Sequence, residues 1–205
     1  MKLTWLGHSC FLFECDGGSV VIDPYAPGYV PGLALPRDIT ADAVILSHAH
    51  ADHGCAEAVT LTGRTPAFAV MQLDTFHDEV GGAKRGKNRV TVIDVEGLRL
   101  VHLGDLGHEL DAAQLARLGR VDVLMLPVGG FYTVDAAAAR RIADAVGARI
   151  TVPMHYKGAN FGYDELGGVE AFTAISDNVV CSDSNVLTLP SEYEGVTLVL
   201  RCPTK

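Results

Sequence analysis

Ala43-Val44-Ile45-Leu46 leads directly into Ser47-His48-Ala49-His50-Ala51-Asp52-His53-Gly54. The apolar run predicts a strand covered on both faces, and the sudden change to polar residues marks the end of that strand. Side chains two residues apart in an extended segment point the same way, so His48 and His50 can reach one metal ion. We expect Asp52 and His53 to face a second ion.

Metal binding explains this cluster better than packing does. Three imidazoles crowded at the end of a strand would repel one another once protonated. Imidazole and carboxylate ligands together suit zinc and, less selectively, nickel, manganese, iron or cobalt. The segment therefore predicts a site for divalent metal ions.

Short strands precede this segment. We predict antiparallel strands over residues 3–6, 10–15 and 19–23, with a turn at 16–18. Residues 24–36 are so rich in proline and glycine that regular structure is excluded, and we expect a surface loop at the rim of a cleft.

A second polar loop follows a later apolar strand. Residues 90–95 and 98–103 predict a hairpin around Glu96-Gly97, and its second strand runs into Gly104-Asp105-Leu106-Gly107-His108. Strands and helices mixed in this way, without a nucleotide-type glycine-rich loop, predict two packed sheets flanked by helices. The other predicted elements are a strand at 121–127, a helix at 134–146 with Thr133 or Asp135 as its cap and Gly147 after it, a strand at 149–153 that ends near His155, and strands at 179–181, 186–189 and 196–202.

The length of 205 residues allows one sizeable core and is too short for two ordinary domains, so we predict a single domain over residues 1–205. The cysteines are odd in number and irregularly spaced, with no Cys-x-x-Cys pair. Neither a disulfide framework nor a thiolate zinc knuckle is indicated, and we expect small buried thiols. The cysteines are Cys10, Cys15, Cys55, Cys181 and Cys202.

The charge and the hydropathy pattern limit the classes of binding partner that we expect for this chain. A formal charge of −9 repels nucleic-acid phosphates, and a chain this short has no room for an inserted nucleic-acid clamp. Neither a secretion signal nor a run long enough to span a bilayer is evident. We therefore expect a soluble, cytoplasmic protein with a small-molecule substrate and no nucleic-acid partner; a homo-oligomer is compatible with the sequence.

The pattern His48-x-His50-x-Asp52-His53 after an apolar strand resembles the signature of the metallo-β-lactamase superfamily. The resemblance covers essentially the whole chain, because the later motifs come in the expected order. Within the superfamily, the chain resembles a compact bacterial branch of Zn-dependent hydrolases that is similar to the L-ascorbate-6-phosphate lactonases and the N-acylphosphatidylethanolamine phospholipases. The segments that carry this likeness are Gly7–Phe11, Ile22–Pro24, Phe76–Asn88, His102–His108 and Pro153–Tyr156.

This resemblance implies a four-layer αββα sandwich with a dinuclear metal site at the sheet edges. It also implies hydrolysis of an ester, lactone, thioester or phosphodiester by a hydroxide that the two ions activate. Zinc is the expected metal, with nickel, manganese or iron as alternatives. The implied ligands are His48, His50 and His77 for the first ion, Asp52, His53 and His155 for the second, and Asp105 as the bridge.

Other side chains are candidates for supporting roles. His8 and His108 lie in glycine-adjacent loops and could contact the substrate or the transition state, so we count them with Asp52 and Asp105 as candidate catalytic residues. Asp23 could orient a ligand imidazole or cap its turn. Tyr132 and Tyr156 could donate a phenol hydrogen bond or simply form pocket walls. The basic island Lys84, Arg85, Lys87 and Arg89 could be a solvated loop or a binding site for an anionic group.

Strand parity separates His77 from the other isolated histidines. Along residues 98–103 the side chain of His102 faces opposite to Val101 and Leu103, so it should point away from Asp105. His108 follows Gly107 in a turn better suited to meeting substrate than to fixing an ion. His77 lies where the resembled family places its isolated ligand, so the resemblance implies that His77 completes the first site.

Two alternatives to hydrolysis remain. Histidine and carboxylate ligands also bind iron, so the same site could serve an iron-dependent oxidoreductase, although no flavin domain for diiron electron transfer is present. A non-catalytic metal-binding or ligand-sensing module is the other alternative. The presence of all seven expected ligands favours an enzyme over such a module.

Overall fold

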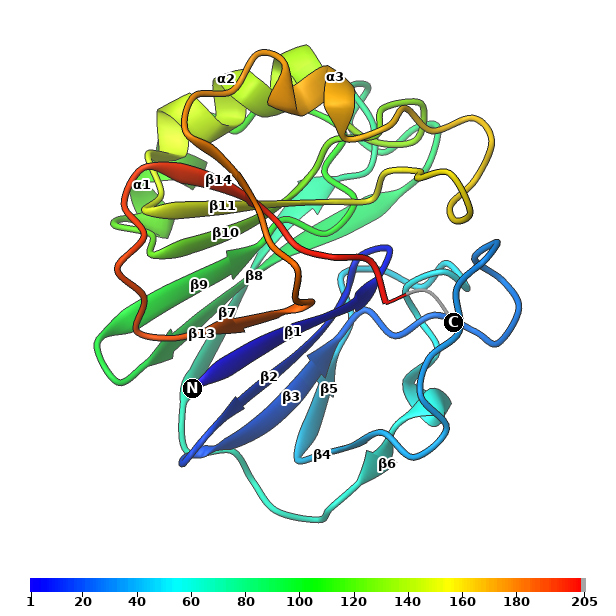
Figure 1. Cartoon of the computed structure of the whole chain (residues 1–205), viewed down its shortest axis with the longest axis vertical. Helices are drawn as coiled ribbons and strands as arrows, with labels where there is room; N and C mark the ends of the chain where they lie inside the picture. The colour runs from blue at the N-terminus through cyan, green and yellow to red at the C-terminus, as the bar shows by residue number, and fades with distance from the viewer. Residues whose placement is uncertain (204–205) are drawn as a thin grey trace.

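The computed structural model describes residues 1–203, which form two sheets packed face to face (Figure 1). In spatial order, the first sheet contains β13 (Val186–Thr188), β1 (Lys2–Gly7), β2 (Cys10–Cys15), β3 (Gly18–Ile22) and β5 (Ala43–Ile45). The second contains β12 (Val179–Cys181), β14 (Val196–Val199), β11 (Ile150–Met154), β10 (Val123–Pro127), β9 (Leu98–His102), β8 (Lys87–Val95) and β7 (Ala69–Phe76). A short parallel pair is formed by β4 (Thr40–Ala41) and β6 (Thr60–Leu61).

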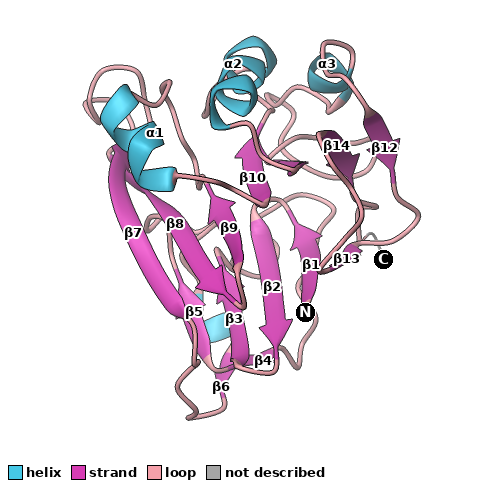
Figure 2. Cartoon of the chain, turned by 90° about the vertical axis from the view of Figure 1, so that its left-hand side faces the viewer, coloured by secondary structure: helices cyan, strands magenta, loops and turns pink. Residues whose placement is uncertain are grey.

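Helices cover the outer face of the second sheet (Figure 2). They are α1 (Ala112–Leu118), α2 (Ala136–Val146) and α3 (Glu170–Thr173). Every residue of β10 and β11 is buried, because the helices lie on one side of these parallel strands and the first sheet on the other. The α2 helix begins at Ala136, two residues after the predicted start. Its caps are as predicted: the Asp135 side chain accepts a hydrogen bond from the Ala138 N–H, and Gly147 ends the helix in the left-handed conformation.

A loop, rather than an α-helix, covers the outer face of the first sheet in the described part of the chain. Its proline and glycine residues prevent a long helix, and only a single short 3₁₀ turn, η1 (Ala56–Ala58), lies nearby. The loop buries its own apolar cluster, which includes Tyr25, Val30 and Leu33 from the loop and Val21 from the sheet. The metallo-β-lactamase sandwich is thus present, with loop structure as its outermost layer on this side.

The strand predicted at residues 43–46 is present, but the prediction that it is covered on both faces is wrong. β5 is the edge strand of the first sheet, and Ala43, Val44 and Ile45 are only half-buried. An edge strand has a neighbour on one side only, which no local apolar run can reveal. The sequence interpretation also missed β7 and α1.

The expected hairpin is confirmed, whereas the expectation for the cysteines holds only in part. β8 and β9 pair antiparallel around Glu96 and Gly97. All five cysteines are free, but only Cys10 and Cys55 are buried; Cys15 and Cys202 are half-buried, and Cys181 is exposed. Among residues 1–203, no helix is long and apolar enough to cross a membrane.

Candidate metal centre

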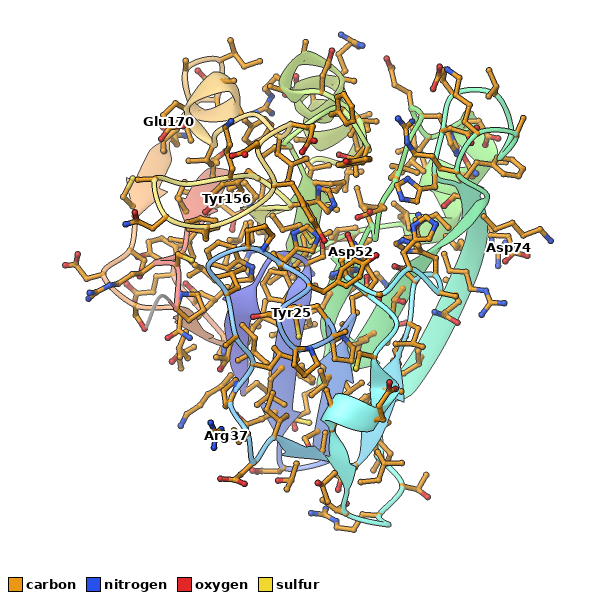
Figure 3. The ribbon with its side chains drawn as sticks, turned by 90° about the vertical axis from the view of Figure 1, so that its right-hand side faces the viewer. Tyr25, Arg37, Asp52, Asp74, Tyr156 and Glu170 are labelled. Atoms are coloured by element: carbon orange, nitrogen blue, oxygen red, sulfur yellow. The ribbon has the colours of Figure 1, made fainter. Side chains whose placement is uncertain are left out.

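Loops from both sheets meet at one edge of the sandwich. His77 directly follows β7, Asp105 follows β9, and His155 directly follows β11. These three strands run in the same direction, so their carboxyl ends lie at the same edge. The segment from His48 to His53 arrives from β5 of the first sheet, and Figure 3 shows Asp52 where the loops of the two sheets meet.

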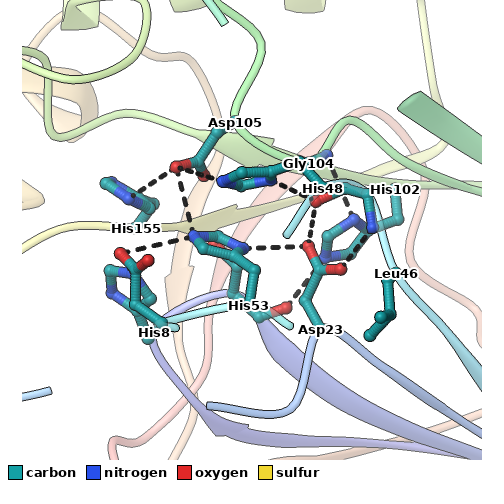
Figure 4. Close-up of polar contacts among 12 residues, drawn as sticks. His8, Asp23, Leu46, His48, His53, His102, Gly104, Asp105 and His155 are labelled. Atoms are coloured by element: carbon teal, nitrogen blue, oxygen red, sulfur yellow. Dashed lines mark hydrogen bonds and ion pairs between the residues drawn. The ribbon is translucent and has the colours of Figure 1, made fainter. Parts of the chain in front are cut away.

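Asp105 lies at the centre of this meeting point (Figure 4). Its Oδ2 lies 3.1 Å from Nε2 of His53 and 3.2 Å from Nε2 of both His77 and His155. Nε2 of His48 lies 3.9 Å from the same oxygen. One carboxylate oxygen therefore faces imidazoles that come from three separate loops.

The structure brings together all seven residues that the sequence interpretation named as ligands. Three overlapping groups have their candidate ligand atoms within 4.8 Å of one another. The first group is the predicted first-site set, His48, His50 and His77. The second is the predicted second-site set joined by His8, namely His8, Asp52, His53 and His155. The third, His48, His53 and Asp105, links the two sets.

The donor set fits divalent cations, because several of its polar atoms are buried without a hydrogen-bond partner. These atoms are Nε2 of His48, His53 and His155 and Oδ1 of Asp105. Buried polar groups in native proteins nearly always have partners, so several such atoms in one cluster are what a site for a ligand is expected to show. Neutral imidazoles and carboxylates are donors that zinc and related ions prefer.

Burial opposes protonation of two histidines in this cluster, His48 and His8. Burial, together with His53, lowers the pKa of His48 to about 3, and burial lowers the pKa of His8 to about 4. Burial would also lower the pKa of His53, but Asp105 and Asp23 outweigh it and raise that pKa well above its ordinary value. The two carboxylates beside His53 thus favour positive charge at this position, which a bound cation would also supply.

Asp23 contacts the segment that carries His48 and His53, which matches the first of the two roles considered for it, the orientation of a ligand imidazole. Its Oδ2 lies 3.0 Å from Nδ1 of His53 and accepts a 2.6 Å hydrogen bond from the Ser47 hydroxyl, while its Oδ1 accepts a 2.7 Å bond from the Ser47 N–H. The same hydroxyl lies 2.9 Å from Nδ1 of His48. Asp23 thus orients two imidazoles so that both Nε2 atoms face Asp105.

His102 is a buried structural residue, as strand parity predicted. Its Nε2 donates to the Ser9 carbonyl at 2.8 Å, and its Nδ1 accepts from the Gly104 N–H at 3.1 Å. Both ring nitrogens are therefore occupied, and neither can bind an ion.

The expectation that His108 is a catalytic residue is not supported by its contacts. Its Nε2 accepts from the Phe76 N–H at 3.2 Å, and its Nδ1 donates to the Glu109 carbonyl at 2.8 Å. Its ring lies against Phe76 and forms no part of the pocket described below. Gly107 packs on the backbone of His77 and Asp78, and the next residue, His108, therefore lies at the end of β7 rather than in the cluster.

His8 does join the cluster. It is buried, its Nε2 lies 3.3 Å from Oδ2 of Asp52, and its ring centroid lies 4.2 Å from that of His155. His8 and His155 both have positive φ, and the His155 N–H donates to the His8 carbonyl at 3.3 Å. Such conformations are costly for residues other than glycine, and they persist here because two loops hold each other in place.

A pocket of about 360 Å³, termed the site pocket, opens onto the cluster. Tyr132 lines it, but Tyr156 is a core residue that packs on Trp5, so the expected phenol-donor role does not fit Tyr156. Sequence reasoning missed Tyr163, although the glycine-rich segment after His155 marked a loop there. The lining residues are Tyr29, His50, Ala51, Asp52, His77, Lys84, Arg85, Asp105, Tyr132 and Tyr163.

Gly107 allows the loop after β9 to reach His77. A Cβ atom at position 107 would lie only 2.2 Å from the Asp78 nitrogen and 2.4 Å from the His77 carbonyl carbon. The Gly107 N–H also donates to the Phe76 carbonyl at 3.0 Å. The absence of a side chain here therefore sets the approach of His77 to Asp105.

We expect Gly107→Ala to cost about 1–3 kcal/mol of unfolding free energy, because the methyl group must push two backbone segments apart. It should also weaken metal binding by displacing His77. Chemical denaturation and metal titration measure the two effects. Gly17→Ala is the matched control, since its new Cβ would meet its nearest neighbours, the Cys15 sulfur and the Ala67 carbonyl oxygen, at ordinary distances of 3.5 and 3.6 Å. Equal stability of the two variants would contradict the role of Gly107.

Residues 2–155 match the Beta-lactamase superfamily domain. A UPF0173 metal-dependent hydrolase from Methanoculleus marisnigri is 33% identical over 191 residues, which cover 76% of this chain and 81% of the relative. One from Archaeoglobus fulgidus is 29% identical over 193 residues, with coverage of 76% and 83%.

Among solved structures, the chain is similar to a protein from Thermotoga maritima described as a Zn-dependent hydrolase of the metallo-β-lactamase superfamily. The TM-score is 0.74 at 32% identity, and the match covers 97% of this chain and 98% of the other. The sandwich fold, the histidine and aspartate cluster at its edge and these relatives all indicate the same family. The chain therefore belongs to the metallo-β-lactamase superfamily and, within it, to the UPF0173 family of metal-dependent hydrolases.

Proposed function

We propose that this protein hydrolyses an ester, lactone, thioester or phosphodiester bond of a small substrate with two divalent metal ions, preferably zinc. The observation that supports this most strongly is the position of Asp105, whose Oδ2 is within 3.2 Å of imidazoles from both predicted ligand sets. We assign His48, His50 and His77 to one ion and Asp52, His53 and His155 to the other. Asp105 is the bridge.

Two such ions would activate a water molecule and polarise the oxygen of the scissile group. The chain's own residues prepare the site for this task. Asp23 fixes His53, and His8 holds one oxygen of Asp52, so the donor atoms converge before any ligand binds. Tyr132 and Tyr163 form a wall of the site pocket, against which a small substrate can be oriented.

A serine or cysteine nucleophile does not fit this site. The Ser9 hydroxyl is fully buried without a hydrogen-bond partner, and no base lies within hydrogen-bonding distance to activate it. Burial raises the pKa of the Cys10 thiol well above its ordinary value, which opposes formation of the reactive thiolate. Both observations favour direct attack by water.

We expect the purified protein to bind about two equivalents of divalent metal per chain, as two ligand sets require. Mass spectrometry of metals after mild dialysis measures the content and the identity together. Zinc would support hydrolysis, whereas stoichiometric iron with an optical signature would favour the oxidoreductase alternative. A protein that retains no metal and gains none on titration would contradict the proposal.

The function is tested by screening the metal-loaded protein against matched lactones, thioesters and phosphodiesters. Hydrolysis that stops on chelation and returns on addition of metal is the expected result. Chelation-insensitive turnover would exclude the site described above.

A further inference from the structure

A second hollow continues from the site pocket past His50. It has a volume of about 440 Å³ and is termed the basic groove. His50 and Arg85 line both the site pocket and this second hollow, so these two residues mark the boundary between them. The basic groove is lined by Leu46, Ser47, His48, Ala49, His50, Arg85, Lys87 and Arg89.

The basic groove is positively charged, in contrast to the chain as a whole. Three of its lining residues carry a positive charge and none is an aspartate or glutamate, although the whole protein has a formal charge of −9. Lys87 and Arg89 lie two residues apart on β8 and project on the same side of it. The Arg89 N–H donates to the Ser47 carbonyl at 3.0 Å, which places this pair of side chains beside the His48 loop.

Arg85 is held in position rather than free in solvent. Its Nη2 donates to the Phe131 carbonyl at 2.9 Å, and its guanidinium carbon lies 5.7 Å from the centre of the Tyr132 ring. Among residues 1–203, no carboxylate lies within ion-pair distance of Arg85 or Lys87, whereas nearby Lys84 pairs with Glu79 and Arg89 lies 3.6 Å from Asp74. Figure 3 shows Asp74 pointing outward from the edge strand β7, away from the site. The positive charges of Arg85 and Lys87 are therefore not neutralised within the protein.

The loop that presents Arg85 is organised by one buried carboxylate. Asp78, directly after His77, accepts hydrogen bonds of 2.7 to 3.0 Å from the N–H groups of four residues of its own loop. Burial opposes ionisation of Asp78, but these bonds outweigh it and lower its pKa to about 2. The loop thus has a defined shape before any ligand binds. The four donors are Val80, Gly82, Lys84 and Arg85.

We propose that the basic groove binds a phosphoryl group of the substrate, with Arg85 and Lys87 as the residues that recognise it. The inference rests on the proposed function, because it places the scissile bond in the site pocket and the phosphoryl group beyond His50. An arginine fork with a second cation beside it matches the two charges and three terminal oxygens of a phosphate monoester better than a single carboxylate. The substrate class is therefore a phosphorylated ester, lactone or thioester.

The test measures binding of methylphosphonate, which carries the phosphoryl charge but no hydrolysable ester bond, to the metal-loaded protein by calorimetry. Acetate is the carboxylate comparison. A charge-assisted hydrogen bond is worth enough that Arg85→Gln should weaken methylphosphonate binding about tenfold or more. Arg85→Lys should restore part of the affinity, and Lys87→Gln, at an exposed position whose ammonium group forms no ion pair within residues 1–203, should weaken it without affecting folding.

Arg117→Gln on α1 is the matched control, because it removes the same charge from an exposed residue that does not line the groove and should leave the affinity unchanged. Equal affinity of Arg85→Gln, Lys87→Gln and the unmodified protein for methylphosphonate would overturn the proposal. So would an equal loss of acetate affinity, which would show a general anion site. Metal content and hydrolysis are measured separately, so Arg85-dependent phosphonate binding by an inactive protein would refute only the proposed function.

Discussion

Asp105→Ala is expected to abolish turnover and to lower the metal content of the protein from about two equivalents to fewer than one. The carboxylate faces both ligand sets, so its loss weakens two sites at once. Changes to residues that merely support a metal ligand already cost about 10–100-fold, and we expect a loss of turnover beyond that range. Metal analysis and a hydrolysis assay on the best substrate from the screen measure the two effects.

The core should stay folded in this variant, because Asp105 lies in a loop after β9 and not within the sheet. Asp74→Ala is the control, since it removes an exposed aspartate of β7 whose ion pair with Arg89 is long at 3.6 Å. Burial would raise the pKa of Asp105, but His155 and His53 outweigh it and hold that pKa well below its ordinary range, so the residue is a carboxylate. If Asp105→Ala retained full turnover and two metal ions, its bridging role would have to be abandoned.

His77→Ala should lower the affinity of the first metal site at least tenfold, whereas His102→Ala should leave that affinity nearly unchanged. The reason lies in their ring contacts. Nε2 of His77 lies 3.2 Å from Oδ2 of Asp105, and the His77 ring centroid lies 4.8 Å from that of His48. Both nitrogens of His102 are instead bonded to backbone groups.

His102→Ala is therefore expected to lower the free energy of unfolding rather than the metal affinity. It leaves the buried Ser9 carbonyl and the Gly104 N–H without partners, which costs about 1–3 kcal/mol for each unsatisfied group. Metal titration and chemical denaturation of both variants separate the two roles. The assignment fails if His102→Ala loses first-site affinity while His77→Ala keeps it.

Local spacing alone was enough to predict the metal-binding character of this chain. Three histidines and an aspartate between positions 48 and 53 cannot be far apart in any fold, so their clustering needs no tertiary information. The hairpin of β8 and β9 and the helix α2 follow for the same reason, since turn residues, caps and apolar periodicity act over a few neighbouring positions. The parity of residues 98–103 correctly turned His102 away from Asp105.

Only the tertiary structure decided which distant residues meet at the sheet edge. Asp52 lies beside His8, which is 44 positions away in sequence, because the loop after β1 and the loop after β11 hold each other in place. His108 turns to the end of β7 because Gly107 packs on the backbone of His77 and Asp78. Arg85 reaches the site pocket because Asp78 shapes its loop, and β5 lies at a sheet edge because no further strand pairs with it. Contacts of this kind depend on how whole strands and loops pack, and local sequence patterns carry no information about that packing.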